Sequence, residues 1–72
     1  MQFKIEGGDL DYTVTVNVER QGGVWGVTLS LFGKTTPALA VAGAGAVEAA
    51  HTALAVLDLP HHAAALARQY NL

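Results

Sequence analysis

The residues best suited to chemistry lie near the predicted boundary between two helices. His61 and His62 follow Asp58 by three and four residues, a spacing at which side chains on one helix can meet, and His51 precedes them. Two imidazoles and a carboxylate can bind a transition metal, so a small metal-dependent enzyme is one hypothesis. We favour a simpler interpretation, in which Asp58 caps a helix and the histidines are solvated in its first turn. We therefore expect no bound metal and no cofactor.

Two further patterns could be mistaken for active-site motifs. Three carboxylates, Glu6, Asp9 and Asp11, surround a predicted turn and could form a calcium loop or a catalytic pair. Turn preference and solvation at strand ends explain them more simply. The Gly-Ala-Gly segment at residues 43–45 lacks the third glycine and the following lysine of phosphate-binding turns, so we interpret its glycines as allowing a helix to pack closely on a sheet. We expect no enzymatic activity.

Charge and composition disfavour several classes of protein. The net charge is −2, and the basic residues are scattered along the chain, so there is no stripe that could bind a nucleic-acid backbone. The apolar stretch at residues 38–57 is interrupted by Glu48, His51 and Thr52, which argues against a membrane-spanning helix. The chain has no cysteine and therefore no disulfide, which fits a cytoplasmic protein of a bacterium or phage.

Regular alternation of apolar residues predicts a sheet. Tyr12, Val14, Val16 and Val18 alternate with polar residues, as do Trp25, Val27, Leu29 and Leu31 after a Gly-Gly pair. Phe3 and Ile5 continue the pattern in a first strand. Turns at Gly8-Asp9 and Gly22-Gly23 would place Ile5 opposite Tyr12, Phe3 opposite Val14, and Val16 opposite Leu29. All the apolar residues then share one face with Val16 fully buried, while the other face is rich in threonine and faces water.

The second half of the chain predicts helices. Thr35-Thr36-Pro37 ends the alternation, and residues 38–42 could form either a fourth strand or the start of a helix. Helical spacing then covers residues 46–57, and Pro60 marks the first turn of a second helix. The expected fold is a single α+β domain over residues 1–72. It has a three- or four-stranded antiparallel meander with two C-terminal helices packed on one face.

The second turn holds the best candidate for a binding site. In the register above, Arg20 and Trp25 face each other at its end, where a guanidinium can lie over an indole ring. Arginine and tryptophan are enriched among the residues that dominate binding energies. We call Arg20, Gly22, Gly23 and Trp25 the hairpin tip and predict that it contacts a protein partner. Phe32 would fall on the polar face, and we expect a bulge to turn it inward; otherwise it is a second exposed anchor.

The order of elements resembles that of HicB-type antitoxins. The resemblance covers residues 12–57: the Tyr-Thr-Val-Thr-Val strand at residues 12–16, the Gly-Gly-Val-Trp-Gly-Val segment at 22–27, and an alanine-rich helix with Val-Glu-Ala-Ala at 47–50. It implies a partial ribonuclease-H-like fold without catalytic activity, built from three strands, a helix and often another strand. The chain lacks that family's Pro-Gly-Cys type of turn after the third strand and a DNA-binding module, so we transfer no functional residues.

These observations favour a small non-enzymatic module that binds another protein, such as a bacterial or phage regulator or inhibitor. A HicB-like antitoxin and a small metal-dependent enzyme are the alternatives. Hydrophobic residues make up 51% of a chain of only 72 residues, more than one small core can cover. We therefore expect a homodimer or a complex with a different protein, and we place the contact with such a partner at the hairpin tip.

Overall fold

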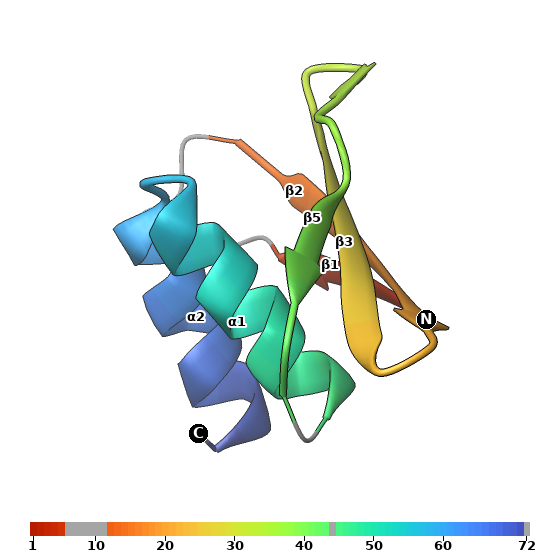
Figure 1. The fold of residues 1–72 in the computed structure, drawn as a ribbon. Helices are drawn as coiled ribbons and strands as arrows, with labels where there is room; N and C mark the ends of the chain where they lie inside the picture. The colour runs from red at the N-terminus through yellow and green to blue at the C-terminus, as the bar shows by residue number, and fades with distance from the viewer. Residues whose placement is uncertain (6–11, 44, 72) are drawn as a thin grey trace.

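The computed structural model describes residues 1–5, 12–43 and 45–71 and shows an α+β fold. An antiparallel sheet has the strand order β1-β2-β3-β4, and β5 also pairs with β3. Two helices cover one face of this sheet (Figure 1), as the sequence predicts. The elements are β1 (Gln2–Ile5), β2 (Val14–Gln21), β3 (Val24–Leu31), β4 (Lys34–Thr35), β5 (Leu39–Val41), α1 (Ala46–Val56) and α2 (Pro60–Tyr70).

The hairpin of β2 and β3 has the predicted register. Val16 lies opposite Leu29, and Arg20 lies opposite Trp25. Gly22 has a φ of 67°. It is the first residue of the two-residue turn, where the turn types that match strand twist require a positive φ. Val16 is fully buried and Thr15 is half-buried, so the predicted faces of the sheet are confirmed.

The predicted register between β1 and β2 is wrong by two residues. Phe3 lies opposite Val16 and Ile5 opposite Val14. The pairing extends to Met1. Its terminal ammonium donates to the Val18 carbonyl at 2.9 Å, and the Val18 amide donates to the Met1 carbonyl at 2.8 Å. A shift of two residues keeps every side chain on its own face, so an alternating pattern cannot distinguish the two registers. The turn predicted at Gly8-Asp9 lies outside the described residues.

The other edge of the sheet is a strand in two pieces, of which the sequence predicted only the second. A tight turn at Phe32 and Gly33, with φ values of 53° and 79°, leads back into β4. The Thr36 amide then donates to the Leu29 carbonyl at 2.8 Å, and the Leu29 amide donates to Thr36 Oγ1 at 3.0 Å. A side-chain oxygen thus takes the place of a backbone carbonyl just before Pro37. Residues 39–41 pair with β3, so the strand interpretation of residues 38–42 is confirmed.

Thr36→Val should lower the free energy of unfolding by about 1–2 kcal/mol. The valine methyl cannot accept the Leu29 amide, which is left without its partner in a partly buried position. Thr35→Val is the matched control, because the Thr35 hydroxyl is exposed and has only a 3.4 Å contact with Ser30 Oγ. Urea denaturation of both variants measures the difference. Equal losses of stability would contradict this role of the Thr36 hydroxyl.

The boundary between the helices differs from the prediction. Helix α1 ends one residue before the predicted limit, and Asp58 follows it with a φ of 60°. The Leu59 amide donates to the Leu54 carbonyl at 2.9 Å, and the Asp58 amide to that of Ala55 at 3.2 Å. This is a Schellman motif with aspartate at the left-handed position usually held by glycine. Asp58 therefore terminates α1 and does not cap α2. The residue in the cap position of α2 is Leu59, and Pro60 lies in the first turn as predicted.

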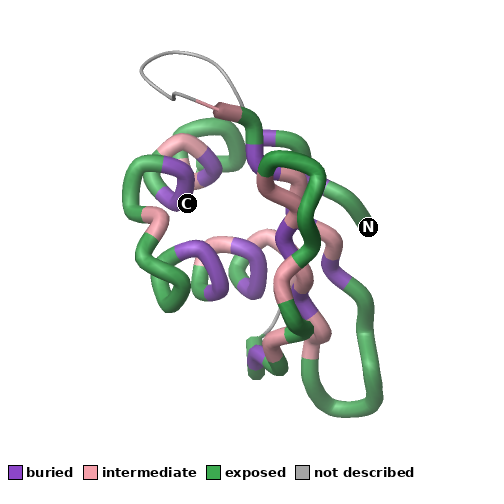
Figure 2. The backbone as a smooth tube through the Cα atoms, turned by 90° about the horizontal axis from the view of Figure 1, so that it is seen from above, coloured by how far each residue is buried: buried purple, intermediate pink, exposed green. Residues whose placement is uncertain are grey.

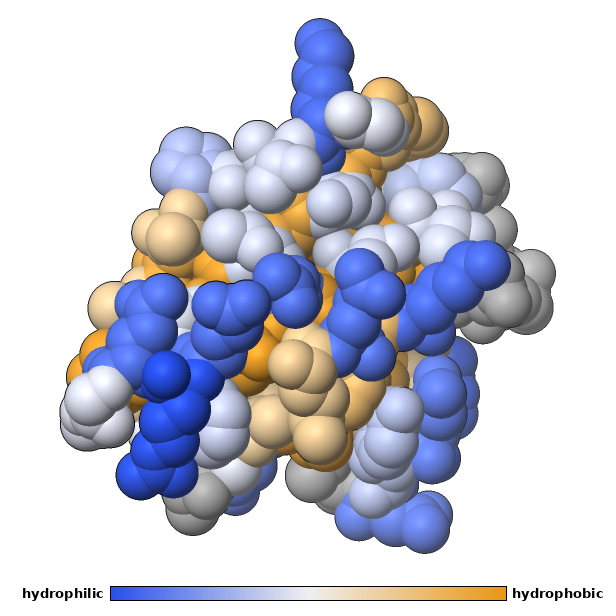
Figure 3. Space-filling view, turned by 90° about the vertical axis from the view of Figure 1, so that its right-hand side faces the viewer, coloured by the Kyte–Doolittle hydropathy of each residue, from blue (hydrophilic) through white to orange (hydrophobic). Residues whose placement is uncertain are grey.

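The core lies between the sheet and the helices. Buried positions of strands and helices face each other across this layer (Figure 2). Three alanines of α1, Ala49, Ala50 and Ala53, are fully buried together with Leu54, and α1 packs on β2, β3, β5 and α2. Small side chains at these positions allow the helix to approach its neighbours closely. On the opposite side of the sheet, hydrophilic and neutral side chains cover much of the surface, with apolar groups visible between them (Figure 3).

Candidate functional site

The hairpin tip carries a positive charge over an aromatic ring. The guanidinium carbon of Arg20 lies 5.2 Å from the centroid of the Trp25 ring. Arg20 is exposed although it lies on the same face of β2 as the buried Val18, and Trp25 is half-buried. A cation–π contact at such an exposed site contributes about 0.5–1 kcal/mol. Both side chains that the sequence placed at this end are therefore in contact.

A hydrogen bond that the sequence did not indicate fixes the indole. Trp25 Nε1–H donates to the Gly43 carbonyl at 3.2 Å, which joins the tip to the chain between β5 and α1. Strand pairing reinforces this link, because Val41 lies directly opposite Trp25. The ring thus has a defined orientation before any partner binds. Loss of side-chain freedom on association is smaller for a group that is already held in place.

The glycines of the turn leave the tip open to approach. A Cβ added at Gly22 or Gly23 would meet no atom within 4 Å. The Arg20 side chain is exposed beside this turn. Val24 is 37% exposed beside the turn. This end of the molecule combines a cation, a flat ring and an apolar side chain.

The histidines and Asp58 do not converge. His61 and Asp58 are exposed, and His51 is half-buried. His62 is 4% exposed, and its Nε2 lies 3.1 Å from the Tyr12 carbonyl oxygen, with the two rings 4.8 Å apart. The prediction that the histidines are solvated is therefore wrong for His62. Within residues 1–5, 12–43 and 45–71, no three histidine or acidic side chains come together in a way that could hold a metal ion.

A closer look at the spacing could have identified the buried histidine. His62 follows Leu59 by three residues and precedes Leu66 by four, so it lies on the apolar stripe of α2. The backbone carbonyl of Tyr12 lies within hydrogen-bond distance of the His62 Nε2 atom, so the buried imidazole has a polar partner. His62 is thus a hydrogen-bonded residue of the core.

Phe32 is exposed and is not turned inward by a bulge. It is 77% exposed, and its ring lies 4.7 Å from that of Tyr12. The prediction assumed that the third strand continues regularly to Phe32, whereas the chain turns there with a φ of 53°. A phenylalanine in this left-handed conformation is uncommon, because its Cβ crowds the backbone. The structure agrees with the alternative in which Phe32 is an exposed aromatic residue.

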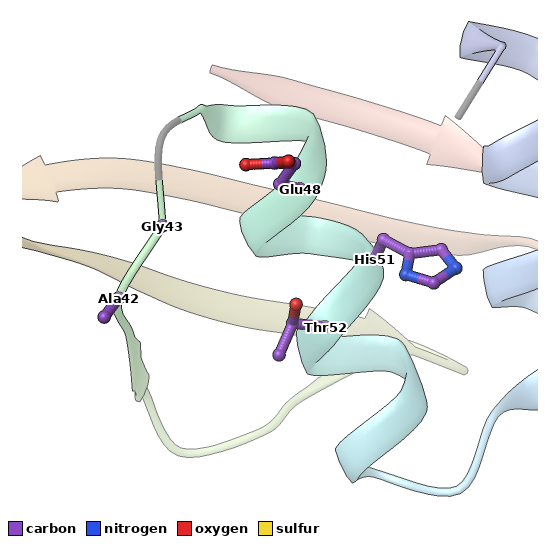
Figure 4. A pocket seen from close by; sticks show the side chains of 5 residues that line it. All are labelled: Ala42, Gly43, Glu48, His51 and Thr52. Atoms are coloured by element: carbon purple, nitrogen blue, oxygen red, sulfur yellow. The ribbon is translucent and has the colours of Figure 1, made fainter.

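A hollow beside α1 was not predicted. Its volume is about 490 Å³, and Ala42, Gly43, Glu48, His51 and Thr52 line it. Glu48 and Thr52 project toward the chain that leaves β5, while His51 points toward the other side of the helix (Figure 4). The lining of the hollow therefore comes from α1 and from the chain that leaves β5.

The glycines next to this hollow do not have the packing role that the sequence suggested. A Cβ added at Gly43 or Gly45 would meet nothing within 4 Å, so neither glycine is required for a close approach of helix and sheet. The alanines of α1 serve that purpose. Ala44 and the acidic cluster of Glu6, Asp9 and Asp11 lie outside the described residues.

No protein-family model, curated protein or solved structure matches this chain. The HicB-type layout has three strands, a helix and often another strand. In the part of the chain that the structure describes, five strands precede α1, and α1 is followed by α2 and not by a strand. No described helix is both long enough and apolar enough to cross a membrane.

Proposed function

We propose that this chain is a small protein-interaction module, a regulator or inhibitor that binds a partner through the hairpin tip. The observation that carries the proposal is the contact of Arg20 with Trp25 at an exposed end of the sheet. Arg20 provides a charge for a carboxylate of the partner, and the indole provides an apolar surface. Arginine and tryptophan are residue types that dominate many interface energies.

The local structure supports this assignment. The hydrogen bond of Trp25 to Gly43 orients the ring, and the two glycines leave room for another chain to approach the turn. The absence of cysteine fits a role in the cytoplasm. A partner with an acidic residue beside an apolar patch would complement this surface in both charge and hydrophobicity.

Replacing both Arg20 and Trp25 with alanine should reduce the affinity for the partner at least about tenfold, equivalent to about 1.4 kcal/mol. The partner is first isolated from the native host with the wild-type chain as bait. Calorimetric titration then compares the affinities of the wild type and the double variant. The double variant should still unfold cooperatively, because neither side chain belongs to the fully buried core.

Two single variants make this test specific. Gly23→Arg places a long side chain in open space at the turn and should block the partner without disturbing the fold. Lys34→Ala removes an exposed cation from β4 and should leave the affinity unchanged, since β4 lies at the opposite end of β3. Full affinity in a folded Arg20/Trp25 double variant would show that the hairpin tip is only the margin of the core.

A further inference from the structure

In the part of the chain that the structure describes, β5 pairs only with β3, so its outer side is an edge of the sheet. Leu39 and Val41 lie opposite Val27 and Trp25 of β3, and Ala40 lies opposite Gly26. The backbone groups of Leu29 are bonded toward Thr36, on the side of β3 where β4 and β5 lie. Because this direction alternates along an antiparallel strand, Trp25 and Val27 also bond toward β5. The bonded residues of β5 are therefore Leu39 and Val41, and the N–H and C=O of Ala40 point outward.

Two of the three features that usually prevent strand addition are missing from β5. Natural proteins protect edges with charged side chains, prolines or very short strands. β4 and β5 are both short, with two and three residues, and β1 carries Lys4. In contrast, no charged residue occurs between Lys34 and Glu48. The side chains that alternate along the β5 edge are small and exposed: Ala38, Ala40 and Ala42.

The space next to this edge can accommodate additional side chains. The hollow of about 490 Å³ adjoins the end of β5 at Ala42 and Gly43, on the side of the sheet that α1 covers. Leu39, on the same side, is only half-buried although it packs on the core. A strand placed beside β5 would direct every second side chain toward this side, where it could cover Leu39 and fill part of the hollow.

We propose that β5 pairs with β5 of a second copy of this chain, antiparallel, about a twofold axis at Ala40. In this register the two Ala40 residues exchange both backbone hydrogen bonds, and Leu39 of each copy lies opposite Val41 of the other. The segment is suited to pairing with itself, because no like charges meet and the facing side chains are small. The two sheets become one, and Leu39, which is half-buried in one copy, is covered by Val41 of the other.

The dimer leaves the hairpin tip free. Val41, at the end of β5, lies opposite Trp25, so the tip is beside one end of the seam between the copies. A twofold axis at Ala40 places the second tip at the opposite end. The pairing is independent of the proposed function: a dimer can form whether or not the tip binds a partner, and the tip can bind without a dimer.

Sedimentation velocity and hydrogen exchange of the full chain test the pairing. The wild type should sediment at twice the protomer mass of 7.5 kDa at high micromolar concentration. The Ala40 amide, which points away from β3, should exchange slowly in the dimer and rapidly on dilution. Ala40→Pro should give a folded monomer, because proline is tolerated on an edge strand where its nitrogen faces outward.

A second variant addresses the case in which proline disturbs the strand. Ala40→Lys keeps the amide but places two ammonium groups opposite each other across the axis, and it should also yield a monomer. Ala64→Lys makes the same change at an exposed position of α2 and should remain dimeric. A monomeric wild type at all concentrations, or a dimer that persists in folded Ala40→Pro and Ala40→Lys, would overturn the proposal. Protection of the Ala40 amide only when a different protein is added would assign the edge to that protein instead.

Discussion

Val16→Asp is expected to abolish folding. Val16 is fully buried in the central strand β2, opposite Phe3 on one side and Leu29 on the other. A carboxylate there would be buried without a partner, at a cost of several kcal/mol. The total stability of a domain of this length is about 4–11 kcal/mol. Far-ultraviolet circular dichroism and the dispersion of amide resonances would show an unfolded chain.

Thr15→Asp provides the matched control for this prediction. Thr15 is the preceding residue of the same strand, but it is half-buried on the polar face. Aspartate at that position keeps access to water and should change the free energy of unfolding by about 1 kcal/mol or less. A folded Val16→Asp variant, or equal effects of the two substitutions, would mean that the sheet does not present these faces as the structure shows.

Ala53→Phe should destabilise the protein by about 3 kcal/mol or more, a large part of its total stability. Ala53 is fully buried in α1, which packs against both the sheet and α2. A phenyl ring at this position would force the helix away from its neighbours, and overpacking of a close-packed core commonly costs about 1–3 kcal/mol for smaller changes. Urea denaturation followed by circular dichroism measures the loss.

The same substitution two residues later separates packing from helix propensity. Ala55 is exposed on α1, so Ala55→Phe adds an identical side chain to the same helix without entering the core. We expect its unfolding midpoint to stay close to that of the wild type. If Ala53→Phe were equally well tolerated, the interface of α1 would not be as tightly packed as the burial of its alanines indicates.

Alternation and turn glycines made the central hairpin predictable. Both faces and the register of β2 and β3 followed from the Gly22-Gly23 turn, since only one pairing joins the two apolar runs across two residues. The same logic determined the faces of β1 but not its register. A shift of two residues exchanges one buried partner for another, and the resulting difference in energy depends on side-chain packing that a pattern does not contain.

Two of the errors occur where side chains adopt backbone conformations that usually belong to glycine. Phe32 and Asp58 both have a positive φ, at the turn into β4 and at the end of α1. Sequence rules assign such positions to Gly or Asn, so the β4 turn was missed and Asp58 was interpreted as a helix cap. In both cases the surrounding hydrogen bonds determine the conformation against local preference.

The candidate site was partly predictable for the same reason as the hairpin. The contact of Arg20 with Trp25 follows directly from the register. The hydrogen bond from Trp25 to Gly43 joins residues 18 positions apart in the sequence. Both this bond and the hollow beside α1 depend on how β5 docks onto β3. Contacts of this kind depend on tertiary docking, so local periodicity could not predict them.

The contact between Phe3 and Tyr70 constrains the order in which a newly made chain can fold. The two rings meet edge to face with centroids 5.4 Å apart, so the first strand is covered by the last turn of the last helix. The β2–β3 hairpin has only local contacts and can form early, whereas this pairing closes a loop that spans almost the whole sequence. During synthesis, Phe3 therefore lacks the cover of Tyr70 until α2 has left the ribosome. The central hairpin can form before this part of the core is complete.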